Sequence, residues 1–333
     1  MSIIIKHDYS CINDFIDTFK DKPTISETNI INFVSKPSYQ ALIKDIGRNF
    51  SLDSSKDWIE IFNFSYNSFA SNSLLKSKGF FVDLAMMSII DAFKDIDNLL
   101  NYTKEVIGVL DEKEFVERAK YYLPSLNKDV SVTVVYSVFM RNAVVENNKI
   151  YIDLPFTQLL SKSQLNDLLS HELHHYLKEF CVPKIVYSKN SNSIESFLRM
   201  LENEGVANLC NFESIYPIYR LLGLNVSACI DSELAKVDEY MISFLKLLER
   251  NLASNNVAVS FKDEFIENLK YVVMSYHMAK TILDLCGIEV LRSLVGNPIP
   301  FFIKYLDCSN LNLNNKYLSE KSISKVLDMN FKL

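Results

Sequence analysis

Hydrophobic residues recur every three to four positions over most of the chain, a spacing that places them along one face of an α-helix. Residues 1–125 are predicted to be helices separated by polar breaks. After Pro155 the helical pattern continues nearly to the C-terminus, and Ser161 with Gln164 forms a capping box at its start. The helices predicted in this part lie at about 161–180, 193–213, 232–252, 261–286, 288–306 and 318–328.

One segment between the two helical parts follows a different period. Apolar residues alternate with other residues from Val130 to Val138 and again from Ile150 to Leu154, which is the pattern of a β-strand. The polar stretch 146–149 between them is a turn signal. We therefore predict an antiparallel pair of strands at about 130–144 and 149–154 and little other sheet. The expected fold class is mainly α with a small antiparallel β-sheet (α+β).

The change of pattern near residue 125 predicts two regions. Residues 1–125 form a helical N-terminal region whose role no sequence feature indicates, and residues 126–333 form a second domain. With 333 residues the chain exceeds the size at which a single core stops growing. Its 48 % hydrophobic content, with 22 Phe and 17 Tyr, can supply large cores, and 7 Gly and 8 Pro are too few for an all-β chain rich in tight turns.

The net charge of the chain and the lengths of its apolar segments limit the expected binding partners and the expected cellular location. A net charge of −6 gives no reason to expect nucleic acid or an anionic membrane as a partner. The apolar residues 3–5 are too few for the core of a signal peptide, and the longest apolar stretch, 80–90, is too short to span a bilayer. The six cysteines form no CxxC pair. We expect a cytoplasmic protein with reduced thiols and no membrane segment.

The segment 171–175, His-Glu-Leu-His-His, is an HExxH motif and holds three of the five histidines in the chain. On a helix, residues four apart lie on one face, so His171 and His175 can present two imidazole nitrogens to one zinc ion. Glu172 lies one step around the helix, where its carboxylate can reach a water on the metal without binding the metal. The motif predicts a catalytic metal site. Its ligand types indicate zinc, with manganese or iron as alternatives.

A catalytic zinc site needs a third protein ligand as well as an open position. The longer motif HExxHxxGxxH would require Gly at 178 and His at 181, but the chain has Lys178 and Cys181. The alternative is a glutamate from the next predicted helix. Glu204 emerges from a partly apolar face there, and Gly205 leaves room for close approach. Glu202 points about 160° away on the helical wheel and is expected to be solvated.

Two further polar residues are expected near the metal without binding it. Asn208 lies one turn after Glu204 and can accept a hydrogen bond from the distal nitrogen of a ligand histidine. His174 lies between the two ligand positions, where packing or a hydrogen bond is favoured over ligation.

With Glu-Gly-x-Ala at 204–207, about 30 residues after the HExxH motif, residues 130–306 resemble the gluzincin-type zinc metallopeptidases. They are most similar to bacterial zinc-dependent peptidase families of unknown function. The resemblance implies a zincin-like catalytic lobe built on a motif helix and a glutamate helix. It also implies one zinc ion held by His171, His175 and Glu204, with Glu172 as the catalytic glutamate. Asn208 stands where gluzincins often have an aspartate.

Two more segments are similar to parts of these families. Arg141-Asn142-Ala143 resembles the substrate-binding edge strand that precedes the motif helix, which implies that Asn142 and Ala143 bind substrate. Residues 271–279 are similar to Tyr-x-x-Gly-x-x-x-Met-Ala, with Met replacing the Gly. The candidates for donating a hydrogen bond to the developing oxyanion are Tyr271, His277 and Tyr276. Of these, Tyr276 lies in an apolar stripe and is expected to be structural.

These residues support metal-assisted hydrolysis of a peptide bond, with Glu172 as general base. The sequence therefore predicts a zinc endopeptidase or aminopeptidase that acts on peptide or protein substrates. The alternative from another class is a non-catalytic helical scaffold that binds a partner and keeps a structural metal. Glu172 favours the enzyme, because a structural site has no need of a carboxylate beside the water on the metal.

Overall fold

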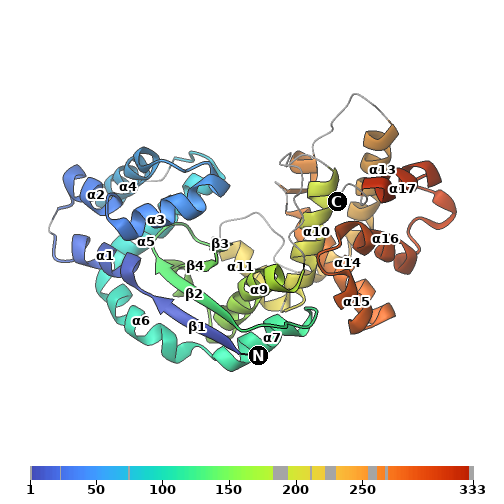
Figure 1. Cartoon of the computed structure of the whole chain (residues 1–333). Helices are drawn as coiled ribbons and strands as arrows, with labels where there is room; N and C mark the ends of the chain where they lie inside the picture. Colours follow the sequence, from blue (N-terminus) through green and yellow to red (C-terminus); the bar gives the residue numbers. More distant parts are fainter. Residues whose placement is uncertain are drawn as a thin grey trace. The chain divides into compact units, whose positions relative to one another are not determined.

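The computed structural model describes residues 2–22, 24–73, 76–182, 194–210, 212–221, 230–253, 261–266 and 269–329. Most described residues are helical, and one four-stranded sheet is present (Figure 1), which confirms the mainly α, α+β class. The strands are β1 (Ile3–Asp8), β2 (Val130–Ser137), β3 (Ala143–Glu146) and β4 (Lys149–Asp153). The helices up to the HExxH segment are α1 (Ser10–Phe19), α2 (Glu27–Val34), α3 (Pro37–Ile46), α4 (Ser55–Ala70), α5 (Phe80–Lys94), α6 (Ile96–Val109), α7 (Glu112–Tyr121), α8 (Leu154–Thr157) and α9 (Lys162–Cys181). The later helices are α10 (Ile194–Asn208), α11 (Phe212–Leu221), α12 (Ile230–Leu234), α13 (Val237–Ala253), α14 (Lys270–Cys286), α15 (Ile288–Leu294), α16 (Pro298–Ser309) and α17 (Glu320–Met329).

The sheet is mixed, so the prediction of an antiparallel sheet was wrong. Its order is β1-β2-β4-β3, with parallel pairing of β1 with β2 and of β2 with β4. Only β3 and β4 are antiparallel, and they form a hairpin at the predicted polar turn, where Asn147 and Asn148 both have positive φ. Alternation shows which residues share a face, but it carries no information on strand direction.

Strand β1 is a second correction, because residues 1–125 were predicted to be helical throughout. Three consecutive isoleucines, Ile3 to Ile5, show no alternation in the sequence. In the structure Ile4 is exposed while Ile3 and Ile5 are partly buried, so the alternation appears only in the burial of the residues. The strand forms because β2 supplies a parallel partner 127 positions further along, with Ile3 opposite Val130.

The chain packs into two compact units. One comprises residues 1–114 and 128–176, and the other comprises residues 115–127 and 177–333. Helix α9 therefore begins in the first unit and ends in the second. The predicted boundary near residue 125, between a helical N-terminal region and a second domain, stays a prediction.

In the first unit, helices gather beside the sheet (Figure 1), and α1 packs on β2. A cluster of fully buried aromatic rings fills the core around Phe15, Phe33 and Phe62. The buried Asp153 carboxylate joins the sheet to its surroundings. It accepts hydrogen bonds from the Ser88 hydroxyl at 2.5 Å and from the N–H groups of Phe139 at 2.9 Å and Phe156 at 3.1 Å.

In the second unit, α10 packs closely against α14. A Cβ added at Gly205 would lie 2.4 Å from the carbonyl oxygen of Ser275, so the two backbones approach at a distance that only glycine allows.

Several of the helices predicted after residue 190 are shorter in the structure than predicted, or are broken into two. The helix predicted at 288–306 is divided into α15 and α16, because Gly296 has φ +79° and Pro298 begins the second helix.

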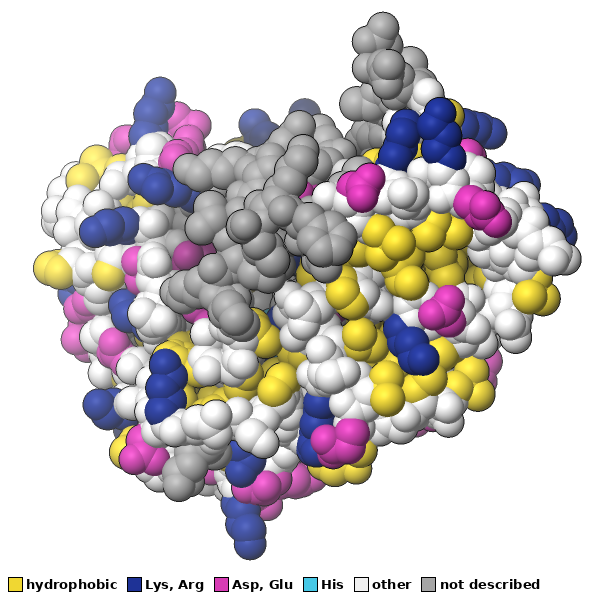
Figure 2. Space-filling view, turned by 45° about the vertical axis from the view of Figure 1, so that its right-hand side comes forward, with side chains coloured by type: hydrophobic (Ala, Val, Ile, Leu, Met, Phe, Trp, Pro, Cys, Tyr) yellow, Lys and Arg dark blue, Asp and Glu magenta, His cyan; other side chains and the backbone are white. Residues whose placement is uncertain are grey.

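On the face in Figure 2, the described acidic and basic side chains are interspersed with apolar ones. Among the described helices, none is both long and apolar enough to cross a membrane.

Candidate metal centre

Helix α9 carries the HExxH motif, and its start has a local cause. At its start the predicted capping box is confirmed: the Ser161 hydroxyl accepts from the N–H of Gln164 at 3.2 Å, and the Gln164 side chain accepts from the N–H of Ser161 at 2.9 Å. The Tyr176 hydroxyl donates to the Ser131 carbonyl at 2.6 Å, which fixes the helix to strand β2. The motif is therefore held on a regular, anchored helix, as its spacing requires.

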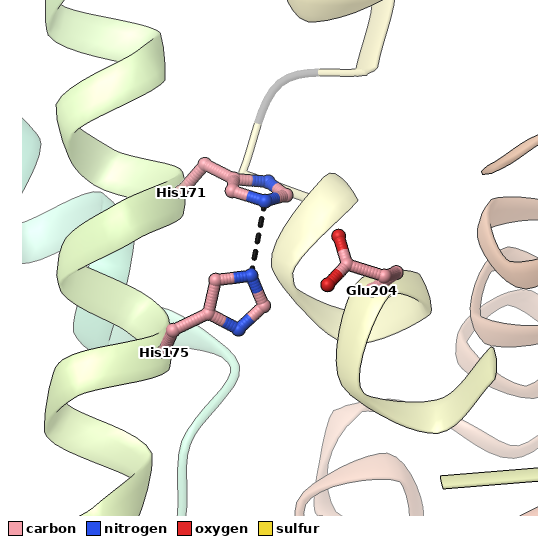
Figure 3. Close-up of side chains that lie close together, drawn as sticks. All are labelled: His171, His175 and Glu204. Carbon is pink, nitrogen blue, oxygen red and sulfur yellow. Dashed lines mark hydrogen bonds between the residues drawn. The ribbon is translucent and has the colours of Figure 1, made fainter. Parts of the chain in front are cut away.

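The two motif histidines point their Nε2 atoms at one another, at a distance of 3.0 Å (Figure 3). Two nitrogens bound to one tetrahedral zinc, each about 2.05 Å from the metal, would lie about 3.3 Å apart. Figure 3 shows the Glu204 carboxylate, from helix α10, facing the same space. One ligand atom from each of His171, His175 and Glu204 can be chosen so that all three lie within 4.8 Å of one another. Two imidazoles and one carboxylate are a donor set that zinc accepts.

Two further residues of α9 that could in principle bind a metal, His174 and Cys181, lie outside this group. His174 is fully buried, with its ring centroid 6.3 Å from that of His175, and it does not belong to the group of converging ligand atoms. Cys181 is the last residue of α9 and is also outside it. Glu172, the predicted general base, follows His171 on the helix and is 7 % exposed.

Glu202 is not solvated, and that expectation was wrong. Its side chain is completely buried and forms an ion pair with Lys178, the Nζ of which lies 2.6 Å from Oε2 and 2.8 Å from Oε1. The N–H of Gly296 donates to Oε1 at 2.9 Å. The helical wheel placed Glu202 on the face of α10 opposite to Glu204, and the turn between α15 and α16 packs over the Glu202 side chain. The burial of Lys178 was not predicted, because a lysine near the end of an amphipathic helix is normally a surface residue.

The three oxyanion candidates on α14 have different neighbours. Tyr271 lies on the same face as Ser275, the residue that faces α10. Burial raises the pKa of Tyr271, and the negative charge of Glu204 raises it further. The ring of His277 packs against Tyr305 with centroids 5.8 Å apart, and burial lowers the pKa of His277.

Tyr276 stacks on Phe212 with ring centroids 4.0 Å apart, in line with its expected structural role. Of the three candidates, Tyr271 is therefore the one beside the predicted third ligand.

The side chain of Asn208 is polar and fully buried, which is unusual for an asparagine. It is 0 % exposed, and among the described residues neither its amide nitrogen nor its amide oxygen has a hydrogen-bond partner. A buried amide without partners costs about 1–3 kcal/mol, so such groups usually serve a purpose. The structure shows no hydrogen bond between Asn208 and a ligand histidine, and this role of Asn208 stays a prediction.

The predicted substrate-binding residues Asn142 and Ala143 lie where β3 begins. Strand β3 is at the edge of the sheet, and Ala143 pairs with Ile152 on its inner side. The carbonyl of Asn142 accepts from the N–H of Asp153 at 3.1 Å. Within the described part of the chain, the outer side of β3 pairs with no other strand, as an edge that receives an extended peptide must.

Comparison with known proteins adds one finding. A family model described as "Putative zinc dependent peptidase (DUF5700)" matches residues 30–312. No curated protein matches the chain, and no solved structure matches it.

Proposed function

The chain belongs to the DUF5700 family, and from this premise we propose that it is a peptidase that hydrolyses peptide bonds with one zinc ion bound by His171, His175 and Glu204. The observation that carries the proposal is the convergence of these three side chains, whose ligand atoms lie within 4.8 Å of one another. Three protein ligands leave one position of a tetrahedral zinc open, which is the arrangement of catalytic sites.

Each remaining residue then has a defined task. A zinc ion held by His171, His175 and Glu204 would supply Lewis acidity at this site. Glu172 accepts a proton from the attacking water and passes it to the leaving amine. Tyr271 donates a hydrogen bond to the oxygen that gains negative charge. Asn208, whose amide oxygen has no partner among the described residues, would accept the distal N–H of a ligand histidine once the metal is bound.

The substrate of the proposed reaction is an extended peptide. The outer side of β3, which begins at Ala143, pairs with no other strand among the described residues, and an extended peptide would pair there as an added strand. Backbone pairing binds many sequences, since it reads the main chain and leaves the side chains to separate pockets.

The alternative of a non-catalytic scaffold with a structural metal is less well supported. Structural zinc sites are usually closed by four protein ligands. Among the described residues, the converging group contains three. The buried Glu172 next to a ligand histidine also has no task in a closed site.

The substitution Glu172→Gln tests the proposal. The amide keeps the size of the side chain but cannot accept a proton, so hydrolysis of a peptide library should fall about 10²- to 10⁴-fold while zinc content and melting temperature stay the same. Glu179→Gln, an exposed position on the same helix, is the matched control and should keep full activity. Equal turnover in Glu172→Gln and the wild type would show that Glu172 is not the base.

A further inference from the structure

A buried ion pair lies next to the proposed metal ligands. Lys178, 8 % exposed, is three residues after His175 on α9, and Glu202, 0 % exposed, is two residues before Glu204 on α10. Both oxygens of the Glu202 carboxylate contact the Lys178 ammonium. The last turn of the histidine helix is therefore tied to the helix that carries the third ligand.

The turn between α15 and α16 completes this pair. The N–H of Gly296 donates to Glu202 at 2.9 Å, and a Cβ at Gly296 would lie 2.7 Å from Cγ1 of Val182. Gly296 therefore lets the turn come close enough to the end of α9 to donate its N–H. These contacts hold the Glu202 carboxylate in one orientation.

The Lys178 ammonium also contacts Asn203, which in turn contacts the proposed zinc ligand Glu204. The Lys178 Nζ donates to Oδ1 of Asn203 at 3.1 Å, and Nδ2 of Asn203 donates to Oε1 of Glu204 at 3.4 Å. An ammonium can only donate, so the Asn203 oxygen must face Lys178, and the NH₂ group must then face Glu204. The lysine thus sets the orientation of the amide, and the amide contacts the carboxylate.

Stability alone is a poor explanation for this arrangement. The desolvation of two buried charges offsets most of their attraction, so a buried ion pair contributes little net stability compared with apolar residues of the same size. It does define geometry, because every partner is directional. Residues that hydrogen-bond to metal ligands typically change metal affinity 10- to 100-fold when they are replaced.

We propose that Lys178, Glu202 and Asn203 form a positioning relay that orients the Glu204 carboxylate, so that zinc affinity depends on three residues that do not touch the metal. The inference rests on the proposed role of Glu204 as a zinc ligand. It assigns a functional reason to the buried Glu202, which the sequence pattern placed in solvent.

The test is the zinc dissociation constant, measured by competition with a chromophoric chelator on the full chain. Asn203→Ala removes the contact to Glu204, and its partly exposed position lets the variant fold. We expect about 10- to 100-fold weaker zinc binding, with the melting temperature of the zinc-free protein unchanged. The pair Lys178→Met with Glu202→Gln removes both buried charges together and should weaken zinc binding to a similar extent.

The matched control is Lys280→Met with Asp284→Asn, which removes an exposed ion pair on α14 and should leave zinc affinity unchanged. Zinc affinity of Asn203→Ala within twofold of the wild type would overturn the relay, even if the double variant failed to fold. Glu204→Ala separates the two proposals. If it loses zinc while Asn203→Ala does not, only the relay fails. If it retains zinc, the ligand assignment itself fails.

Discussion

Glu202 and Glu204 show how two identical residues in one helix can have different surroundings. The Glu202 carboxylate is enclosed by the Lys178 ammonium and the N–H of Gly296, which satisfy both of its oxygens. The Glu204 carboxylate faces His171 and His175 instead. Among the described residues, Glu202 does not belong to the group of converging ligand atoms. The third-ligand role is therefore proposed for Glu204 alone.

Replacing Glu204 by Ala should remove most of the zinc from purified protein, because two histidines bind zinc far more weakly than three protein ligands. The measurement is metal content by mass spectrometry after exhaustive dialysis. Glu195→Ala, in the first turn of the same helix, is the control and should retain one zinc ion per chain. Stoichiometric zinc in the Glu204 variant would contradict the assignment.

At the scale of elements, the contact between α10 and α14 brings two proposed site residues, Glu204 and Tyr271, close to one another. Gly205 faces the Ser275 carbonyl on α14, and Tyr271 lies one turn before Ser275 on the same face. Glu204 is next to Gly205 in α10. The close approach of the two helices is thus what brings the Tyr271 side chain near the Glu204 carboxylate.

Gly205→Ala should separate the two helices, because the added Cβ would lie 2.4 Å from a backbone oxygen that cannot move independently. We expect a loss of about 1–3 kcal/mol in the free energy of unfolding, measured by chemical denaturation, together with weaker zinc binding. Gly108→Ala in α6 is the matched control, since nothing lies within 4 Å of its added Cβ. That change should be neutral or stabilise the helix by up to about 1 kcal/mol. Equal effects of the two substitutions would argue against the packing explanation.

For the whole molecule, the buried Asp153 links stability to pH. It joins α5, the segment after β2, and α8 through its three hydrogen bonds. Burial raises the pKa of Asp153 from its ordinary value of 3.8 to about 7, although the three donors oppose this change. Between these two pH values the folded chain keeps a proton that the unfolded chain has released. The contribution to stability is therefore fully present below about pH 4 and is lost as pH rises through about 7.

The melting temperature should accordingly include a component that falls between about pH 4 and pH 7 and that is absent in Asp153→Asn, since the amide does not ionise. The variant should be less stable than the wild type at pH 5, because its NH₂ group cannot accept the hydrogen bond that one carboxyl oxygen accepts. Melting curves of both proteins over this pH range provide the measurement. Parallel pH profiles would show that another group causes the dependence.

Features that depend on neighbours in the chain were predictable from the sequence. The face shared by His171 and His175 follows from helical geometry alone, as does the capping box at Ser161. The turn at Asn147 and Asn148 follows from the ease with which asparagine adopts positive φ. In each case the residues involved are at most four positions apart, so local rules are sufficient.

Features that depend on distant partners were decided only by the tertiary structure. Strand β1 and the parallel direction of β2 and β4 arise from pairing across the chain, which alternation does not encode. Glu202 is buried because Lys178 and Gly296, 24 and 94 residues away, enclose it. A helical wheel gives the direction of a side chain but not what packs there. The free energy of burying a charge depends on the partner it meets, and that partner is known only once the chain has folded.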